Sequence, residues 1–525
     1  MKTMKILNRI SKGFLLTASF ALVLSSCSED IMDDINKDIN HSQDAQAKFI
    51  VADILTATAF SNTGGDISTY MSSYVEHEVG THNQLFRGEN RQNEPSAAST
   101  FNNTWGSLYS ALKNAKIVID KCSVGGTQEG NVFTKGVAEV LAAYNLALLT
   151  DMFGDVPWLE ACDYTAHMNP VIDKQEDIYG DILAYIESAI VDLQGNDAHA
   201  TGGLAGYDLM YNGHKANWLK FAYGLKARYT MRLLKRSSNV NTDLEMVITC
   251  VDNSFQSASE QAAFAIYDAS NLNPLFDFQW SRDGLAASES MAQKLIDRND
   301  PRLRRVFVDP DWEQITGPAD PAYFMAPNGA NEELQYWYNT SIFVYSQIAP
   351  TLLLSYHEVL FLKAEALCRL TRPLEAEPVL KQAVIAAIAN TERSISAALN
   401  APTVNGYGGI VENTAAIDAT EAGTYFDTEV KPLFDANPLS ETMIQKYIGF
   451  FGASGEAPEC YNDIRRMKAL GESFVVLNNP NNATKFPLRL PYGNDDTTAN
   501  PNVQVAYGDG QYVYAEPVWW AGGTR

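Results

Sequence analysis

The segment at residues 136–161 restricts the possible fold more than any other part of the chain. In GVAEVLAAYNLALLTDMFGDVPWLEA, apolar side chains recur at helical spacing on two faces, and Glu139 is the only charged residue before Asp151. A helix that is apolar on two faces must be covered on two sides, so we expect it to lie between other helices, as in a helical repeat array. Gly154 can adopt the positive φ that ends a helix and Pro157 cannot continue one, so we expect the helix to end there.

The N-terminus has the features of a secretion signal. Basic residues precede the apolar run Phe14–Leu24, which is too short to span a membrane. The small residues before Cys27 resemble the bacterial lipobox, in which the cysteine is lipidated and becomes the first residue. We therefore predict a lipoprotein signal peptide over residues 1–26, a lipid anchor on Cys27, and an acidic tether over residues 27–40.

Composition argues against several classes of partner. The chain has 525 residues and a formal net charge of −24, so its surface repels phosphate backbones and we expect no nucleic-acid partner. The glycine-rich stretch at 201–206 lacks the lysine and hydroxyl residue of a phosphate-binding loop, and we expect no cofactor. The cysteines after Cys27 lie far apart without a C-x-x-C pair, so we predict neither a disulfide framework nor a zinc site.

Capping patterns place two further helices. Asp173 and Glu176 resemble a capping box, as do Ser355 and Glu358. Under this interpretation the Glu358 side chain caps its helix, and Glu358→Gln should cost little stability. Helical periodicity predicts the other main helices at residues 45–60, 104–121, 217–236, 288–297, 375–390, 441–451 and 456–467.

Several short segments along the chain resemble the motifs of one protein family. In chain order they are FGDVPWLEA at 153–161, WLKFAYGLKAR at 218–228, DPRL at 300–303, YHEVLFLKAEA at 356–366, IQKY at 444–447, ECYNDIRR at 459–466 and FPLRLPY at 486–492. Together they resemble the SusD/RagB family, lipoproteins that capture nutrients at the outer membrane of Bacteroidetes. The branch that they resemble most is the SusD-like one described as starch-binding and associated with the outer membrane.

The resemblance implies a fold and a function. The expected fold is mostly α, a tetratricopeptide-like helical scaffold with a large loop-rich ligand-binding face, as a single domain over residues 41–525. The expected function is that of an outer-membrane lipoprotein, lipid-anchored and facing the cell exterior, that captures an oligo- or polysaccharide and passes it to a TonB-dependent SusC-like transporter. The resemblance implies no catalytic residue. Two alternatives stay open: a surface glycoside hydrolase, whose paired carboxylates cannot be picked out among 63 acidic residues, and the same role for peptides.

Candidate ligand-binding residues lie in two polar segments that are rich in aromatic residues, Tyr70–Arg87 and the region between about Ser254 and Ile348. Apolar faces of sugar rings pack on aromatic planes, and sugar hydroxyls need polar partners. Ordinary loop packing is the alternative for each aromatic residue. Tyr336, Trp337 and Tyr338 are the first choice, and Trp337→Ala should weaken glycan binding by roughly 1–3 kcal/mol without lowering the melting temperature. The other candidates are Trp280, Trp312, Arg282, Asp283, Tyr70 and Phe86.

One histidine pattern invites comparison with a zinc site. His77 and Glu78 are followed by His82, but the metalloprotease motif needs its histidines four residues apart. A separation of five rotates the second ring by about 140° around a helix, and Gly80 interrupts the segment. We therefore predict no bound metal.

Overall fold

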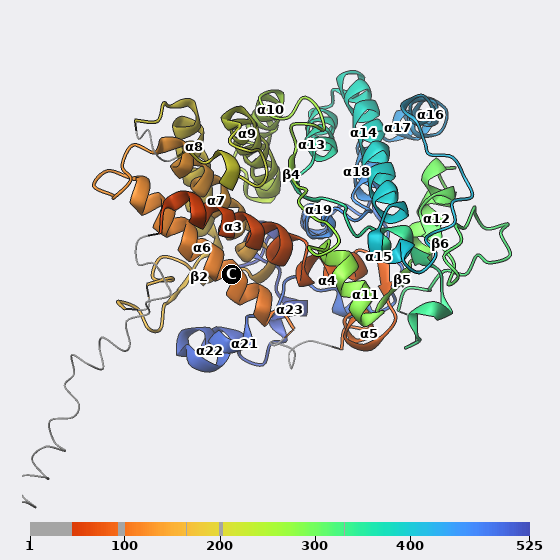
Figure 1. The fold of residues 1–525 in the computed structure, drawn as a ribbon, viewed down its shortest axis with the longest axis horizontal. Helices are drawn as coiled ribbons and strands as arrows, with labels where there is room; N and C mark the ends of the chain where they lie inside the picture. The colour runs from red at the N-terminus through yellow and green to blue at the C-terminus, as the bar shows by residue number, and fades with distance from the viewer. Residues whose placement is uncertain (1–44, 93–99, 164, 199–202, 330) are drawn as a thin grey trace, which may run out of the picture. The chain divides into compact units, whose positions relative to one another are not determined.

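The apolar segment at 136–161 forms the central helix of the computed structural model. This helix, α7 (Val132–Phe153), is buried along nearly its whole length. Four helices pack against it, namely α3 (Ala47–Thr56), α6 (Asn102–Cys122), α8 (Gln175–Gln194) and α9 (Lys215–Arg232) (Figure 1). The expectation that it is covered on several sides is confirmed. By length and composition α7 could also cross a membrane, but its burial inside the protein is that of a core helix.

The structure describes residues 45–92, 100–163, 165–198, 203–329 and 331–525. Contacts group Ala47–Arg525 into one compact unit. The predicted signal peptide, Cys27 and the tether at 27–40 lie outside the described residues.

The end of α7 follows the prediction. Gly154 has φ +85°, and its N–H donates to the carbonyl oxygen of Thr150 at 2.8 Å. A Cβ at this position would lie 2.5 Å from Nη1 of Arg489. Glycine is therefore required both by the backbone conformation and by the close approach of Arg489.

A second group of packed helices completes the scaffold. Helix α10 (Val240–Asp252) packs on α9 and on α13 (Tyr356–Arg369), which in turn packs on α14 (Pro373–Leu399) and α18 (Pro438–Gly449). Helix α19 (Ala457–Leu470) lies against α4 (Asp66–Tyr74). Some neighbouring helices, such as α13 and α14, are joined by short connections, whereas others, such as α10 and α13, pack together although they are far apart in the sequence (Figure 1). The mostly α fold that the sequence predicts is confirmed.

The strands are short and link segments that are distant in sequence. They form antiparallel pairs: β1 (Glu78–Gly80) with β5 (Leu285–Ala287), β2 (Val156–Pro157) with β3 (Ile172–Asp173), β4 (Ala262–Phe264) with β8 (Thr351–Leu354), and β6 (Phe307–Val308) with β7 (Thr340–Ser341). Four of these strands, β4, β5, β6 and β7, lie in the loop-rich region at residues 254–348, and the pairing of β4 with β8 and of β5 with β1 ties this region to the rest of the chain.

Short helices and helical turns make up the remaining elements. The helices are α5 (Asn83–Glu89), α11 (Pro274–Arg282), α12 (Glu289–Ile296), α15 (Pro402–Asn405), α16 (Ala419–Tyr425), α17 (Lys431–Ala436), α20 (Asn482–Lys485), α21 (Asn494–Ala499), α22 (Pro501–Tyr507) and α23 (Tyr512–Ala515). The turns are η1 (Ala57–Thr63), η2 (Ala205–Tyr207), η3 (Leu233–Arg236), η4 (Pro301–Arg304), η5 (Gln335–Trp337), η6 (Ile342–Tyr345), η7 (Phe426–Val430) and η8 (Trp519–Ala521).

The two predicted capping boxes differ from the structure. Ser355 does cap α13, since its Oγ accepts the N–H of Glu358 at 3.1 Å, but the Glu358 carboxylate binds Arg228 instead of closing the box. The prediction for Asp173 is wrong, because the N-cap of α8 is Lys174. The Asp173 carboxylate accepts backbone N–H groups from the turn that follows α7.

Candidate ligand-binding site

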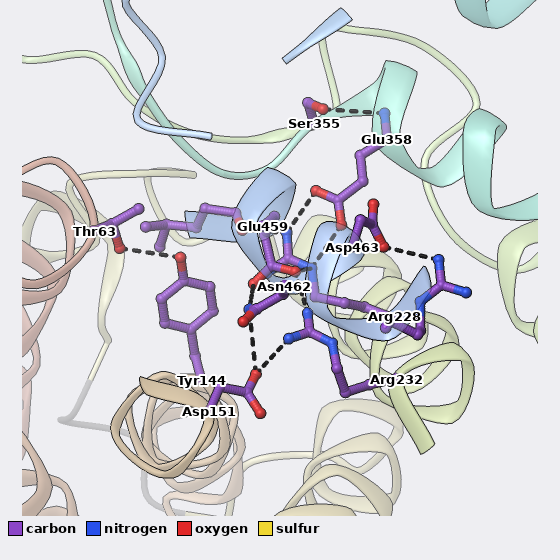
Figure 2. Close-up of polar contacts among 12 residues, drawn as sticks. Thr63, Tyr144, Asp151, Arg228, Arg232, Ser355, Glu358, Glu459, Asn462 and Asp463 are labelled. Carbon is purple, nitrogen blue, oxygen red and sulfur yellow. Dashed lines mark hydrogen bonds and ion pairs between the residues drawn. The ribbon is translucent and has the colours of Figure 1, made fainter. Parts of the chain in front are cut away.

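Charged side chains from four helices meet inside the scaffold. Arg228 on α9 donates to Glu358 on α13 through Nε at 2.7 Å and Nη2 at 2.6 Å. One turn later, Arg232 donates to Asp151 on α7 at 2.8 Å and also binds Glu459 on α19. Figure 2 shows these side chains pointing toward one another from the surrounding helices. We call Asp151, Arg228, Arg232, Glu358 and Glu459 the buried ionic cluster.

The buried ionic cluster has the electrostatics of a structural network. Burial raises the pKa of Asp151 and of Glu358, and the paired arginines offset part of that shift. Burial acts in the same direction on Glu459, but Arg232 and Arg228 outweigh it and hold its pKa below the ordinary value. The cavity beside Asp151, Arg228 and Glu459 measures about 10 Å³, room for one water at most and not for a sugar ring. The cluster therefore joins helices and does not offer a substrate site.

Helix α11 is formed and ended by local signals. The Asn273 side chain accepts the N–H of Leu275 at 2.9 Å, and Pro274 occupies the first helical position. Asp283 ends the helix in the left-handed conformation with φ +51°. Trp280 therefore lies on a helix, whereas the sequence predicted a loop. The short apolar–polar pattern of nine residues within a polar region was too weak to indicate this helix.

Three aromatic rings from separate segments meet beside α11. Trp280 stacks on Phe276 with centroids 5.3 Å apart and planes 16° from parallel. The Trp280 centroid lies 6.2 Å from that of Trp312 and 5.8 Å from that of Tyr407. Trp280 is 36% exposed and Tyr407 is 76% exposed, while Trp312 is half-buried. We call Trp280, Trp312 and Tyr407 the aromatic platform.

Backbone hydrogen bonds hold the two loops of the aromatic platform together. The Asp309 carboxylate accepts the N–H groups of Asp311 and Glu313, at 3.0 and 2.8 Å, and so closes the turn that carries Trp312. The carbonyl oxygen of Trp312 accepts the N–H of Val411 at 2.9 Å, which joins this turn to the loop of Tyr407. Trp312 has φ +65°, a costly conformation for a bulky residue that persists only where its surroundings impose it. The orientation of the Trp312 ring is thus built into the fold.

A polar pocket opens on the other side of α11. Its volume is about 220 Å³, and Asp66, Asn103, Asp277 and Arg282 supply its charged and amide groups. Burial raises the pKa of Asp66, and the Arg282 guanidinium offsets part of that shift. We call this cavity the α11 pocket. Its other lining residues are Phe60, Ser61, Gly65, Thr69, Thr104, Ser107, Pro274 and Phe278.

The three successive aromatics at 336–338 do not act as one surface. Tyr336 and Trp337 are 62% and 56% exposed on the turn η5. Tyr338 is buried and stacks on Phe324 with centroids 5.1 Å apart. The rings of Tyr336 and Trp337 are therefore accessible to a ligand, whereas the ring of Tyr338 packs inside the protein.

The remaining candidates divide between surface and core. Arg282 lines the α11 pocket, and Asp283 is exposed next to it. Phe86 is half-buried on α5. Tyr70 is only 2% exposed and packs against the ring of Phe101, so it belongs to the core and not to a binding surface. Sequence reasoning missed Tyr407, whose only signal is an aromatic residue within the glycine-rich stretch NGYGG.

The histidines of the zinc-like pattern have separate environments. His77 is buried with its Nε2 3.0 Å from the carbonyl oxygen of Tyr447, and burial lowers its pKa to about 3. The Nδ1 atom of His82 lies 3.7 Å from Glu332. Within the described ranges, no group of three or more His, Cys, Asp or Glu side chains is arranged to hold a metal ion.

The family model described as "Starch-binding associating with outer membrane" matches residues 38–492. The chain belongs to the SusD-like family. A crystal structure of a SusD/RagB family protein from Bacteroides thetaiotaomicron, 53% identical in sequence, is similar with a TM-score of 0.87 over 92% of this chain and 100% of that one. No match was found among curated proteins.

More distant SusD-like structures share the fold alone. A chitin-binding protein is 21% identical, with a TM-score of 0.68 over 90% of this chain and 99% of its own. A SusD homologue from Bacteroides fragilis is 17% identical, with a TM-score of 0.65 over 91% of this chain and 100% of its own. SusD-like proteins are binding proteins rather than enzymes. The exposed rings and the polar pocket beside α11 make that surface the candidate site for a binding protein, whereas the buried ionic cluster has no room for a ligand.

Proposed function

We propose that this SusD-like protein captures an oligo- or polysaccharide at the cell surface and passes it to a TonB-dependent SusC-like transporter. One observation carries the proposal: α11 holds Trp280 of the exposed aromatic platform on one side and Arg282 of the polar α11 pocket on the other. Such a combination suits a sugar, which has apolar ring faces and a rim of hydroxyls. The family description as starch-binding supports the same class of ligand.

The geometry of the two parts suggests how a glycan lies on them. Trp280 and Trp312 offer flat apolar area at little entropic cost, because each ring already packs against neighbouring rings in the protein. Asp66, Asn103 and Asp277 supply acceptors in the α11 pocket, and Arg282 supplies donors. We infer that successive sugars stack on the aromatic platform while the hydroxyls of one sugar form hydrogen bonds in the α11 pocket.

A surface glycoside hydrolase is the less favoured alternative. The carboxylates of the buried ionic cluster are paired with arginines beside a cavity too small for a sugar, which makes them unsuitable as the catalytic acids of a hydrolase. A role for peptides has no specific observation in its favour. Retardation of the mature protein in native gels containing starch, chitin, xylan or mannan tests the proposed function. Release of reducing ends from any of these polymers would favour the hydrolase instead.

Delivery to a transporter is tested separately. We propose that the mature protein forms a complex with a TonB-dependent receptor of the outer membrane, and co-purification from detergent-solubilised outer membranes checks this. Recovery of the lipoprotein without any such receptor would contradict the delivery step while leaving glycan capture intact.

Lipid anchoring rests on the sequence signal before Cys27. We propose that the mature chain starts at Cys27, with residues 27–40 as a tether to the domain at 41–525. The Cys27→Ser variant should lose its acyl chain and move from the membrane fraction to the soluble fraction, because a lipid chain is what holds a soluble domain at a bilayer. Metabolic labelling with an alkyne fatty acid checks this. Equal labelling of the variant and the wild type would contradict it.

The exposed ring of Trp337 tests how far the ligand surface extends. We expect Trp337→Ala to weaken glycan binding by about 1 kcal/mol, since one stacking contact is lost and no second ring packs beside Trp337 among the described residues. The melting temperature should not change, because the ring is 56% exposed. Calorimetric titration checks the first point and thermal unfolding the second. If Trp337→Ala bound the glycan with unchanged affinity, the ligand surface would not extend from α11 to Trp337.

A further inference from the structure

A second cleft lies against helix α14 and shares no lining residue with the α11 pocket. Its volume is about 420 Å³, within the range of ordinary small-ligand sites. One wall is formed by Gln256, Ser257, Ala258 and Gln261, another by Tyr356 and His357 at the start of α13, and the floor is a single face of α14. We call this cavity the α14 cleft.

The floor of the α14 cleft is apolar in the middle and polar at its ends. Ile385, Ala386 and Ala389 form the middle, with Gln382 before them and Arg393 after them. Gln382 and Arg393 are eleven residues apart, which corresponds to about 16 Å along a helix. The cleft is thus long enough for more than one sugar ring.

The side chains around this floor match the hydroxyls of a sugar. Gln261 and Asn390 lie at the wall and floor, and each has an amide that both donates and accepts hydrogen bonds. Toward the described residues each uses only one side-chain atom: Oε1 of Gln261 accepts the N–H of Tyr356, and Nδ2 of Asn390 donates to Ser454. The half-buried ring of Tyr356 adds an aromatic surface.

Arg393 gives the cleft its charge. This exposed side chain makes no hydrogen bond or ion pair with the described residues, and no carboxylate lines the cleft. The adjacent Glu392 is already bound to Arg305. The guanidinium of Arg393 is therefore available to a ligand, in a chain where acidic residues outnumber lysines and arginines by 63 to 39. The free guanidinium is suited to bind a carboxylate with two hydrogen bonds.

We propose that the α14 cleft binds an acidic oligosaccharide, with a uronate carboxylate on Arg393 and the ring faces on Tyr356 and the apolar floor. A peptide suits the cleft less well, because grooves for extended peptides offer backbone hydrogen bonds and the backbone of α14 is bonded within its own helix. This site is independent of the proposed function at α11. It would allow the protein to hold uronate-containing glycans by a second contact.

Calorimetric titration of the mature protein with trigalacturonate and with neutral galactotriose tests the proposal. The acidic trimer should bind, and more weakly as salt is added, whereas the neutral trimer should bind poorly. Arg393→Gln removes the charge and leaves a shorter polar side chain with a single NH₂ group as donor, and it should weaken binding at least about tenfold. Arg87→Gln, at another exposed arginine, is the matched control and should bind like the wild type.

Three results would overturn the proposal. They are equal binding of the acidic and neutral trimers, equal binding by Arg393→Gln and the wild type, and failure of the wild type to bind any of galacturonate, glucuronate and mannuronate oligomers. Trp280→Ala separates the two sites, because it should leave uronate binding at the α14 cleft unchanged. Loss of uronate binding in Trp280→Ala but not in Arg393→Gln would assign the ligand to α11 and leave the proposed function standing.

Discussion

Glu358→Gln should lower the free energy of unfolding by about 3 kcal/mol, because it removes the carboxylate that accepts two hydrogen bonds from the buried Arg228 and leaves only the more distant Glu459, 3.7 Å away, as a charge partner. The side chains of Glu358 and Arg228 are almost fully buried, so water cannot replace the lost carboxylate. Glutamine keeps one acceptor, but its NH₂ group would face a guanidinium that has only donors. Urea denaturation at neutral pH measures the change. The capping pattern alone predicted that Glu358→Gln would cost little stability, whereas the contact with Arg228 leads us to expect a large loss of stability.

An exposed ion pair provides the matched control for this substitution. Glu375 binds Arg372 at the start of α14, where both side chains reach water. Glu375→Gln removes the same charge but should change stability little, because surface ion pairs are screened and contribute weakly. If Glu358→Gln were as stable as Glu375→Gln, the buried ionic cluster would not hold the helices together as we infer.

Trp280→Ala should weaken glycan binding by about 2–3 kcal/mol, the range of an interface hot spot and about 30- to 150-fold in Kd. The effect is larger than for Trp337 because Trp280 contacts both other rings of the aromatic platform. Its removal takes away a stacking surface and also the support of Trp312 and Tyr407. Titration with the polymer fragment that the wild type binds measures the loss.

Two further variants separate binding from folding. Tyr407→Ala should reduce affinity at an unchanged melting temperature, since this ring is 76% exposed. Tyr207→Ala removes a partly exposed aromatic ring that packs on Phe49 instead of the platform, and it should bind normally. Wild-type affinity in Trp280→Ala would place the ligand away from α11.

The scaffold could be predicted because its signals are local. The two apolar faces of α7 are visible in consecutive residues, and they indicate burial between other helices without any knowledge of the partners. The positive φ of Gly154 was likewise marked by the residue type. Motifs in chain order then led to the SusD-like family, which the family model and the structures support.

The parts that could not be predicted depend on contacts between distant residues. Glu358 looked like a helix cap because its partner Arg228 lies 130 positions away. Tyr70 was expected at the surface because its neighbours are polar, yet Phe101 covers it in the core. Tyr407 gains its role only where its loop bonds to the turn of Trp312. Sequence patterns identify aromatic side chains, but the folded chain decides which of them meet.

Calorimetric titration of the mature protein with a panel of soluble starch, chitin, xylan and mannan oligosaccharides tests the central claim most directly. We expect saturable binding of at least one of these oligosaccharides, and its loss in a Trp280→Ala/Tyr407→Ala double variant that remains folded. Failure of the wild type to bind any member of the panel, or full binding by the folded double variant, would contradict glycan capture at α11.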